Sequence, residues 1–239
     1  MFFEELKASF NRTFIREDRW RLFVEGIINT MIITVLSILC GTILGFVVYL
    51  ACRGGNVFAN LITRFFVWLI QGTPMVVLLM ILYYIIFGKV DIEGIWVAVI
   101  AFSMTFGAGV YGMLLSGTGA LDRGQTEAAY ALGFTDRRAF FTIILPQAAL
   151  HFMPAYKAEV VALIKATAIV GYIAVQDLTK MGDIVRSRTY EAFFPLIAVA
   201  VIYFVLAGIL NIIVGIIHNR IRPEKRTRDD ILRGIDTHD

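Results

Sequence analysis

Charged and polar side chains inside long apolar runs are the residues of this sequence best placed to do chemistry. An ionisable group inside a membrane is costly, so it usually lines a pathway for a polar solute or pairs with another group. Glu159 and Lys165 stand in one such run, at a spacing that does not require them to pair on a helix. The alternative is that Glu159 sits at the mouth of the span and Lys165 neutralises a neighbour. The candidate pathway residues are Gln71, Thr73, Gly107, Glu159, Lys165 and Thr167.

No pattern in the sequence predicts catalysis or nucleotide binding. The stretch GALDRGQT (119–126) has Gln125 where a phosphate-binding loop has lysine, and no buried strand precedes it. The three histidines, at 151, 218 and 238, lack metal-ligand spacing, and nothing resembles a nucleophile elbow. We therefore expect a non-enzymatic chain without a metal or cofactor of its own, whose energy source is a gradient or another subunit.

The composition is that of an integral membrane protein. Of the 239 residues 58% are hydrophobic and only 17% are charged, against about 25% charged residues in soluble domains. Five apolar runs are long enough to be spans, at about 27–51, 58–87, 92–115, 154–175 and 193–217. The second run is interrupted at QGTP (71–74), where glycine and proline should kink or break it. The predicted fold is all-α with five transmembrane helices.

The segments outside the spans carry most of the charge. Residues 1–26 mix aromatic and charged residues at helical spacing, which predicts an amphipathic helix on the membrane surface, with a disordered tail as the alternative. Residues 27–219 form the predicted membrane domain, and 220–239 form a basic tail that suits an anionic membrane face better than nucleic acid. Five spans place the termini on opposite sides, and the basic residues lean only slightly toward a cytoplasmic C-terminus.

The segment EAAYALGFTDRRAFFTIILP (127–146) is compact, semi-polar and helical between two spans. Glu127 is expected in the first turn of one helix, where a carboxylate favours the helix dipole, and Gly133 is expected to end that helix in a left-handed conformation. Thr135 is expected to cap a second helix that stops before Pro146. Two short helices at an angle would project from the membrane, which fits either a docking element or an ordinary interfacial loop.

This segment resembles the EAA motif of ABC importer permeases at every position of the motif. The matching residues are Glu127, Ala128, Ala129, Gly133, Ile143, Leu145 and Pro146. The chain is also similar to the branch that imports polar amino acids of the histidine and glutamine type, in GTP (72–74), LYY (82–84), GQ (124–125), ILPQA (144–148), the 165–167 region and SRTY (187–190). The likeness extends from about residue 26 to residue 217.

The resemblance implies a type I importer permease fold in the bacterial cytoplasmic membrane, with the N-terminus outside and the C-terminus inside. Region 118–150 is then the cytoplasmic coupling region, which docks through the motif residues into a separate ATP-binding subunit that uses ATP and Mg. The other implied partners are a second permease subunit, identical or different, and an extracytoplasmic amino acid-binding protein, besides the lipid bilayer. No nucleic acid is expected.

Several positions depart from the pattern of the amino acid importers. Gln71 stands where arginine is usual, and Ala166 where an acidic residue usually follows the lysine. Gly112 and Leu115 stand where the third span often carries charges. The charged pocket of some relatives therefore does not carry over to these positions. Either the solute is recognised differently, as a neutral or bulkier molecule, or this chain is the less engaged half of a heterodimer.

Functions of other classes form the alternatives. A gradient-driven secondary transporter or channel would act without an ATPase, but five spans give no inverted repeat and no internal duplication is visible. A non-transporting scaffold that recruits a soluble partner has no use for polar residues inside a span. Uptake that depends on an ion gradient and not on ATP would favour the secondary transporter.

Overall fold

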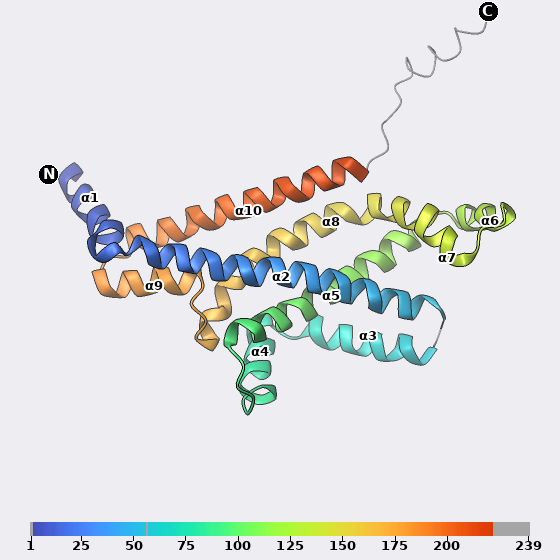
Figure 1. The fold of residues 1–239 in the computed structure, drawn as a ribbon, viewed down its shortest axis with the longest axis horizontal. Coiled ribbons are helices and arrows are strands. Elements are labelled where there is room, and N and C mark those ends of the chain that lie inside the picture. Colours follow the sequence, from blue (N-terminus) through green and yellow to red (C-terminus); the bar gives the residue numbers. More distant parts are fainter. Residues whose placement is uncertain (1, 56, 222–239) are drawn as a thin grey trace, which may run out of the picture.

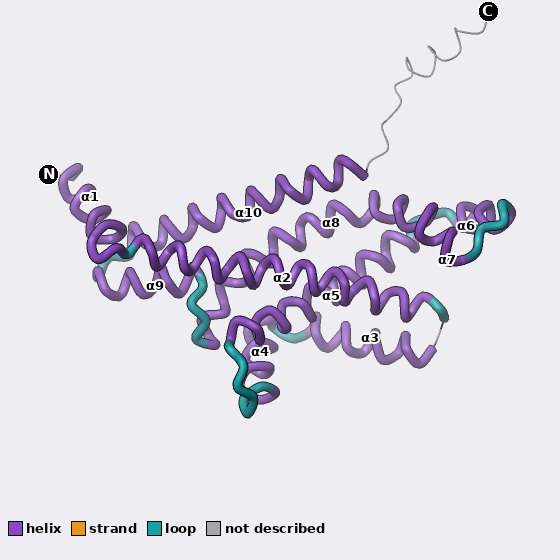
Figure 2. Tube along the Cα trace, viewed as in Figure 1, coloured by secondary structure: helices purple, strands orange, loops and turns teal. Residues whose placement is uncertain are grey.

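The computed structural model of the chain describes residues 2–55 and 57–221, and every regular element in that part is helical (Figures 1 and 2). The α-helices are α1 (Phe2–Phe10), α2 (Trp20–Arg53), α3 (Val57–Gly72), α4 (Met75–Met80), α5 (Gly94–Gly119), α6 (Arg123–Ala131), α7 (Asp136–Ala139), α8 (Leu145–Ala166), α9 (Leu178–Thr189) and α10 (Phe193–Ile221). Short π-helical or 3-10 segments are η1 (Asn11–Ile15), η2 (Arg16–Asp18), η3 (Ile81–Ile86), η4 (Phe140–Ile144) and η5 (Thr167–Ile173). Most of the predicted basic tail, 222–239, lies outside the described residues.

In the described part of the chain, 4 helical stretches are long and apolar enough to cross a membrane: α2, α5, the stretch Asp136–Ile173 that contains α8, and α10. Helix α3 and the α4–η3 stretch form a further candidate, a broken span bent by 107°. The break falls between Gly72 and Met75, where the sequence predicted it, because Pro74 lacks the amide hydrogen that a continuous helix requires. The predicted all-helical fold with five spans is confirmed.

The fourth span begins earlier than the hydropathy predicted. Helix α8 starts at Leu145 and contains Pro154, which was expected near its beginning. A proline inside a helix leaves one carbonyl without its donor, and neighbouring groups in a membrane bundle make this tolerable. Helix α8 ends at Ala166, and the 3-10 segment η5 begins at Thr167.

Helices α2 and α5 lie side by side in the middle of the molecule (Figure 1). Their backbones approach so closely that a Cβ atom on Gly45 would meet the Gly107 carbonyl oxygen, and one on Gly41 would stand 2.9 Å from the carbonyl oxygen of Ser103. Small residues permit this approach between membrane helices. The spacing of Gly41 and Gly45 thus serves packing within the subunit.

Short helices lie at two opposite ends of the helix bundle (Figure 1). At one end α9 packs against α2, and η1 lies beside it, where Arg12 pairs with Glu191 at 3.2 Å. At the other end α6 and α7 lie beyond α5 and α8, close to the last turn of α2. We call these regions the α9 end and the coupling end.

Candidate functional site

The EAA segment begins inside helix α6 and not at the start of that helix. Helix α6 starts at Arg123, and Asp122 caps it by accepting a hydrogen bond from the Gly124 amide at 2.7 Å. Glu127 therefore stands in the second turn, and the prediction that it occupies the first turn is wrong. Aspartate is a favoured N-cap residue, so Asp122 starts the helix upstream of the motif.

The turn between α6 and α7 follows the predicted capping pattern. Gly133 has a φ of +80°, in the left-handed region, and its amide donates to the Tyr130 carbonyl at 2.9 Å. Thr135 caps α7 by accepting a hydrogen bond from the Arg138 amide at 3.4 Å. A Cβ atom at Gly133 would meet nothing within 4 Å, so the backbone conformation, and not the lack of space, favours glycine here.

The second helix of the segment does not stop before Pro146, and that prediction is wrong. Helix α7, the π-helical segment η4 and helix α8 follow one another without a break. The Leu145 amide donates to the Phe140 carbonyl in a π-type turn, and Pro146, which has no amide hydrogen to donate, follows directly as the second residue of α8. The backbone therefore runs as one helical stretch from α7 into a membrane span.

The motif residues differ in how far they are exposed. The exposed ones are Glu127, Ala128, Gly133 and Pro146, the half-buried ones are Ile143 and Leu145, and Ala129 is buried. Beside them Leu132 leaves 76% of its surface exposed. An exposed face of small and apolar residues suits contact with a groove on another protein. Ala129 instead packs inward and holds α6 to the rest of the coupling end.

A contact that sequence reasoning missed joins α2 to the coupling end. Arg53, the last residue of α2, donates two hydrogen bonds to the Asp136 carboxylate, at 2.9 and 2.8 Å. Its guanidinium lies 4.3 Å from the centre of the Phe140 ring. The Tyr130 hydroxyl donates to the same carboxylate at 2.8 Å. Arg53 and Asp136 are 83 positions apart in the chain, so the only signal in the sequence is their opposite charge.

Glu159 faces a small cavity between helices. It is half-buried and lines a space of about 120 Å³ together with Met75 of α4 and Thr105 and Phe106 of α5. Within the described residues its carboxylate has no hydrogen bond or ion pair. Lys165 is exposed and does not pair with it. The structure thus leaves Glu159 as an uncompensated carboxylate beside a cavity inside a span.

Gln71 and Thr73 lie at the bend between α3 and α4. Gln71 is exposed, and the hydroxyl of Thr73, the residue after the end of α3, donates to the Leu69 carbonyl at 2.7 Å. Neither lines the cavity of Glu159.

Gly107 and Thr167 occupy packed positions inside the subunit. Gly107 is buried against α2, where a Cβ atom would stand 3.1 Å from the Gly41 carbonyl oxygen. Thr167 is fully buried, and its hydroxyl donates to the Ile164 carbonyl at 2.7 Å. Gly107 also lines an apolar cavity of about 280 Å³ between α2, α3 and α5, so packing accounts for Thr167 more fully than for Gly107.

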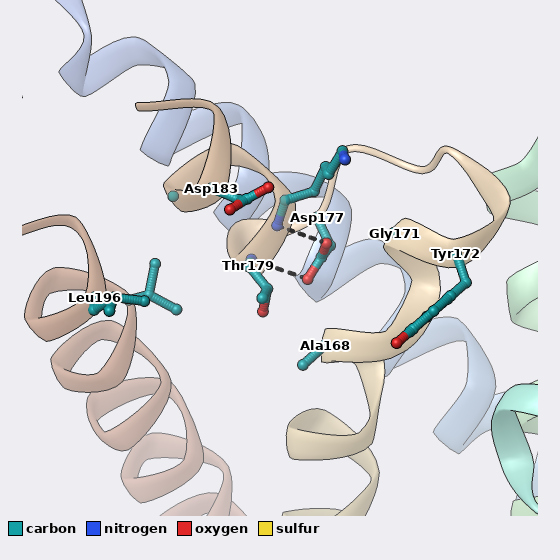
Figure 3. Close-up of a pocket in the computed structure, with 10 residues that line it drawn as sticks. Ala168, Gly171, Tyr172, Asp177, Thr179, Asp183 and Leu196 are labelled. Carbon is teal, nitrogen blue, oxygen red and sulfur yellow. Dashed lines mark hydrogen bonds between the residues drawn. The ribbon is translucent and has the colours of Figure 1, made fainter. Parts of the chain in front are cut away.

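A second cavity, of about 380 Å³, lies between η5, α9 and α10 (Figure 3). Asp177 stands beside it with 0% of its surface exposed. Its carboxylate accepts hydrogen bonds from the Thr179 and Lys180 amides, both at 3.0 Å, and from the Tyr203 hydroxyl at 3.1 Å. Burial raises the pKa of Asp177 above its ordinary value of 3.8. These bonds commit the carboxylate to capping α9, and a cap at this position was not predicted.

Comparison with known proteins gives the same family as the motif. Residues 37–223 match the family model described as binding-protein-dependent transport system inner membrane component. A Rickettsia conorii protein, named provisionally as a glutamine transport system permease protein, is 33% identical over 202 residues, which cover 82% of this chain and 91% of that protein. The arginine transport system permease protein ArtQ of Bacillus subtilis is 36% identical over 196 residues, which cover 80% of this chain and 88% of that one.

Solved structures agree with this assignment. A chain in the crystal structure of an amino acid ABC transporter with histidines is 33% identical and has a TM-score of 0.75, covering 84% of this chain and 94% of that one. A chain of the MetNI methionine ABC transporter in inward-facing conformations has a TM-score of 0.72 at 18% identity, covering 87% and 100%, which shows the shared fold alone. The chain is therefore a multi-pass inner membrane protein, and it belongs to the binding-protein-dependent transport system inner membrane components, the permease subunits of ABC importers.

Proposed function

We propose that this permease forms the solute pathway of an ATP-driven importer of amino acids. The relatives are named for glutamine, arginine and cystine transport systems, which supports an amino acid as the solute. The chain itself is no enzyme in this proposal, and ATP with Mg is used by a separate ATP-binding subunit. An extracytoplasmic binding protein delivers the solute, and a second permease subunit, identical or different, completes the pathway.

One observation carries the coupling part of this proposal. The segment Glu127–Pro146 forms an exposed projection at one end of the molecule, and its second helix continues into a membrane span. A partner that binds the projection and changes shape would therefore move α8 directly. Each state of the transporter then differs in its contacts with the partner, as a shift of populations by ATP requires.

The coupling end faces the cytoplasm in this proposal. The orientation rests on the likeness of the segment 127–146 to the EAA motif, because the basic residues divide almost evenly between the two ends. Helix α10 ends on the same side, since its residue Ile217 lines a cavity together with Leu145. The N-terminus and the α9 end then face the outside, where the binding protein docks.

Glu159 is the proposed contact for the solute in the fourth span. A lone carboxylate inside a membrane favours a cation, and the ammonium group of an amino acid supplies one. Ala166, where the related importers usually have an acidic residue, lines the same cavity. This cavity therefore has the carboxylate of Glu159 and lacks the one that an acidic residue at position 166 would supply. The difference fits a different mode of solute recognition.

The test is purification of the tagged protein from its native membranes in a gentle detergent, followed by mass spectrometry and reconstitution into vesicles. We expect an ATP-binding subunit in near-equal amount, and uptake of amino acids that requires ATP and the binding protein. A second permease chain in the same complex would establish a heterodimer. A chain that elutes alone and transports in response to an ion gradient would contradict the proposal and favour a secondary transporter.

A further inference from the structure

The C-terminal part of α2 presents a stripe of side chains to the coupling end. Phe46, Tyr49 and Arg53 follow one another at helical spacing, so they lie on one face of α2. The ring centres of Phe46 and Phe141 are 6.3 Å apart, and those of Tyr49 and Phe140 are 5.9 Å apart in a stacked arrangement. Arg53 also lies over the ring of Phe140. Each residue of the stripe therefore touches the helical stretch that leads into α8.

The ion pair in this contact is too exposed to contribute much to stability. The Asp136 side chain is 63% exposed and that of Arg53 is 27% exposed. Pairs at such exposure contribute little to the free energy of folding. The two parallel hydrogen bonds and the aromatic ring nevertheless fix the direction of the guanidinium. This contact therefore fixes the position of α7 relative to α2 more than it stabilises the fold.

The same contact reaches α6 on one side and α5 on the other. Through its hydroxyl, Tyr130 of α6 holds the Asp136 carboxylate that Arg53 also binds. The Tyr49 hydroxyl donates to the Thr118 hydroxyl of α5 at 3.0 Å. A displacement of the coupling helices can therefore reach α2 and α5 through side chains, without passing through α8.

We propose that α2 is a second route by which movement of the coupling helices enters the membrane domain, with Arg53 as its positioning residue. The proposal rests on the function proposed above, because it needs an ATP-driven movement of α6 and α7. The continuous backbone from α7 to α8 is the first route. The second route couples the tightly packed α2–α5 pair to the same movement, so that both sides of the helix bundle respond together.

The experiment compares variants of the full chain in vesicles, in complex with the co-purified ATP-binding subunit and binding protein. The quantity measured is the number of amino acid molecules imported per ATP hydrolysed. Arg53→Met is expected to lower this ratio about five- to tenfold, the scale on which mutations along a coupling network act. Subunit assembly should be unchanged. The reversed pair Arg53→Asp with Asp136→Arg should recover part of the loss, because it restores an ion pair between α2 and α7.

Arg21→Met is the matched control, since it removes an exposed arginine that pairs with Asp18 at 3.4 Å at the opposite end of α2. It should leave the ratio unchanged. A normal ratio for Arg53→Met would overturn the second route and leave the proposed function standing. If Arg53→Met fails to assemble, Arg53→Lys decides, because it keeps the charge and loses the paired geometry, and a normal ratio there overturns the route. A wild-type chain that binds no ATP-binding subunit would overturn both proposals.

Discussion

The α9 end and the coupling end both consist of short helices, but the two are fastened in different ways. Helix α9 is held by apolar burial, since Leu178, Met181 and Val185 are at most 1% exposed. Its cap, Asp177, is buried as well. In helix α6 Ala129 is the buried residue, and Gln125 and Tyr130 make hydrogen bonds at the surface. Helix α9 is thus part of the core, whereas helix α6 is only attached to it.

This difference indicates which end can adapt. An element packed into the core moves only together with the body it is packed on. An element with few buried contacts and exposed hydrogen bonds opens or shifts at small cost. The α9 end therefore offers a rigid platform, and the coupling end offers an adjustable contact for a partner that drives the movement from that side.

The largest effect is expected from Gly26→Val, which disrupts the packing of α9 against α2 at the rigid end. A Cβ atom at Gly26 would stand 2.7 Å from the Leu178 Cα atom, so the added side chain must push α9 away from α2. We expect a loss of about 3 kcal/mol in the free energy of unfolding, seen as a lower Tm in detergent. Gly208→Val is the control, because a Cβ atom there meets nothing within 4 Å. An unchanged Tm for Gly26→Val would show that α9 is not fastened to α2 at this point.

A smaller loss at the same end is expected from Asp177→Ala. The substitution removes an N-cap and leaves two backbone amides without their acceptor, which costs about 2 kcal/mol. Hydrogen exchange should speed up in the first turn of α9 and remain slow in α5. Asp183→Ala, which removes an exposed carboxylate of the same helix, should leave the exchange of that turn unchanged. Equal exchange in Asp177→Ala and the wild type would contradict the role of the cap.

At the adaptable end, Gly133→Val should affect transport more than folding. A β-branched residue at a φ of +80° is strained, by about 1–2 kcal/mol, which the turn relieves by changing the angle between α6 and α7. We expect normal membrane insertion and continued ATP hydrolysis, with uptake uncoupled from it. Gly133→Asn should behave nearly as the wild type, because asparagine tolerates the left-handed region. Transport at the normal rate in Gly133→Val would rule out the docking role of the segment.

The smallest effect is expected from Tyr130→Phe. The change removes one hydrogen bond to Asp136 and leaves the Arg53 pair in place, a loss of about 0.5 kcal/mol at an exposed site. The Tm should not change, and the amides of α6 alone should exchange faster. Tyr190→Phe serves as the control, since Tyr190 is 97% exposed at the opposite end. If the exchange of α6 is the same in both variants, the hydroxyl does not hold α6.

Local sequence patterns predicted the features that depend on residues close together in the chain, namely the spans and the turn between the two short helices. Apolar runs located the spans, and Gly133 and Thr135 located the turn at the coupling end. The stop at Pro146 was wrong because a π-type turn ahead of the proline let the helix continue. The position of Glu127 was wrong because Asp122, a residue outside the motif, starts the helix. Both errors concern boundaries, which depend on the wider segment.

Contacts between distant segments were beyond the reach of local patterns. The pairing of Arg53 with Asp136 depends on how α2 and α7 meet in space. No helix was predicted at Leu178–Thr189, although the Asp177 cap and the apolar spacing within that segment favour one. The pathway candidates show the same difficulty. A small or polar residue in a span can pack against another helix or line a solute pathway, and only its neighbours in space distinguish these two roles.

The π-helical segment η4 sets the rotational phase between α7 and α8. A π-turn holds one residue more than an α-turn, and each residue of an α-helix accounts for about 100° of rotation. Deleting one residue from Phe140–Ile144 would let a regular α-helix run through, and would rotate Asp136 away from Arg53 by about that angle. The span would keep its hydrophobic length while α6 faced another direction. The one additional residue of the π-turn thus determines the direction in which the partner-binding surface of this permease faces.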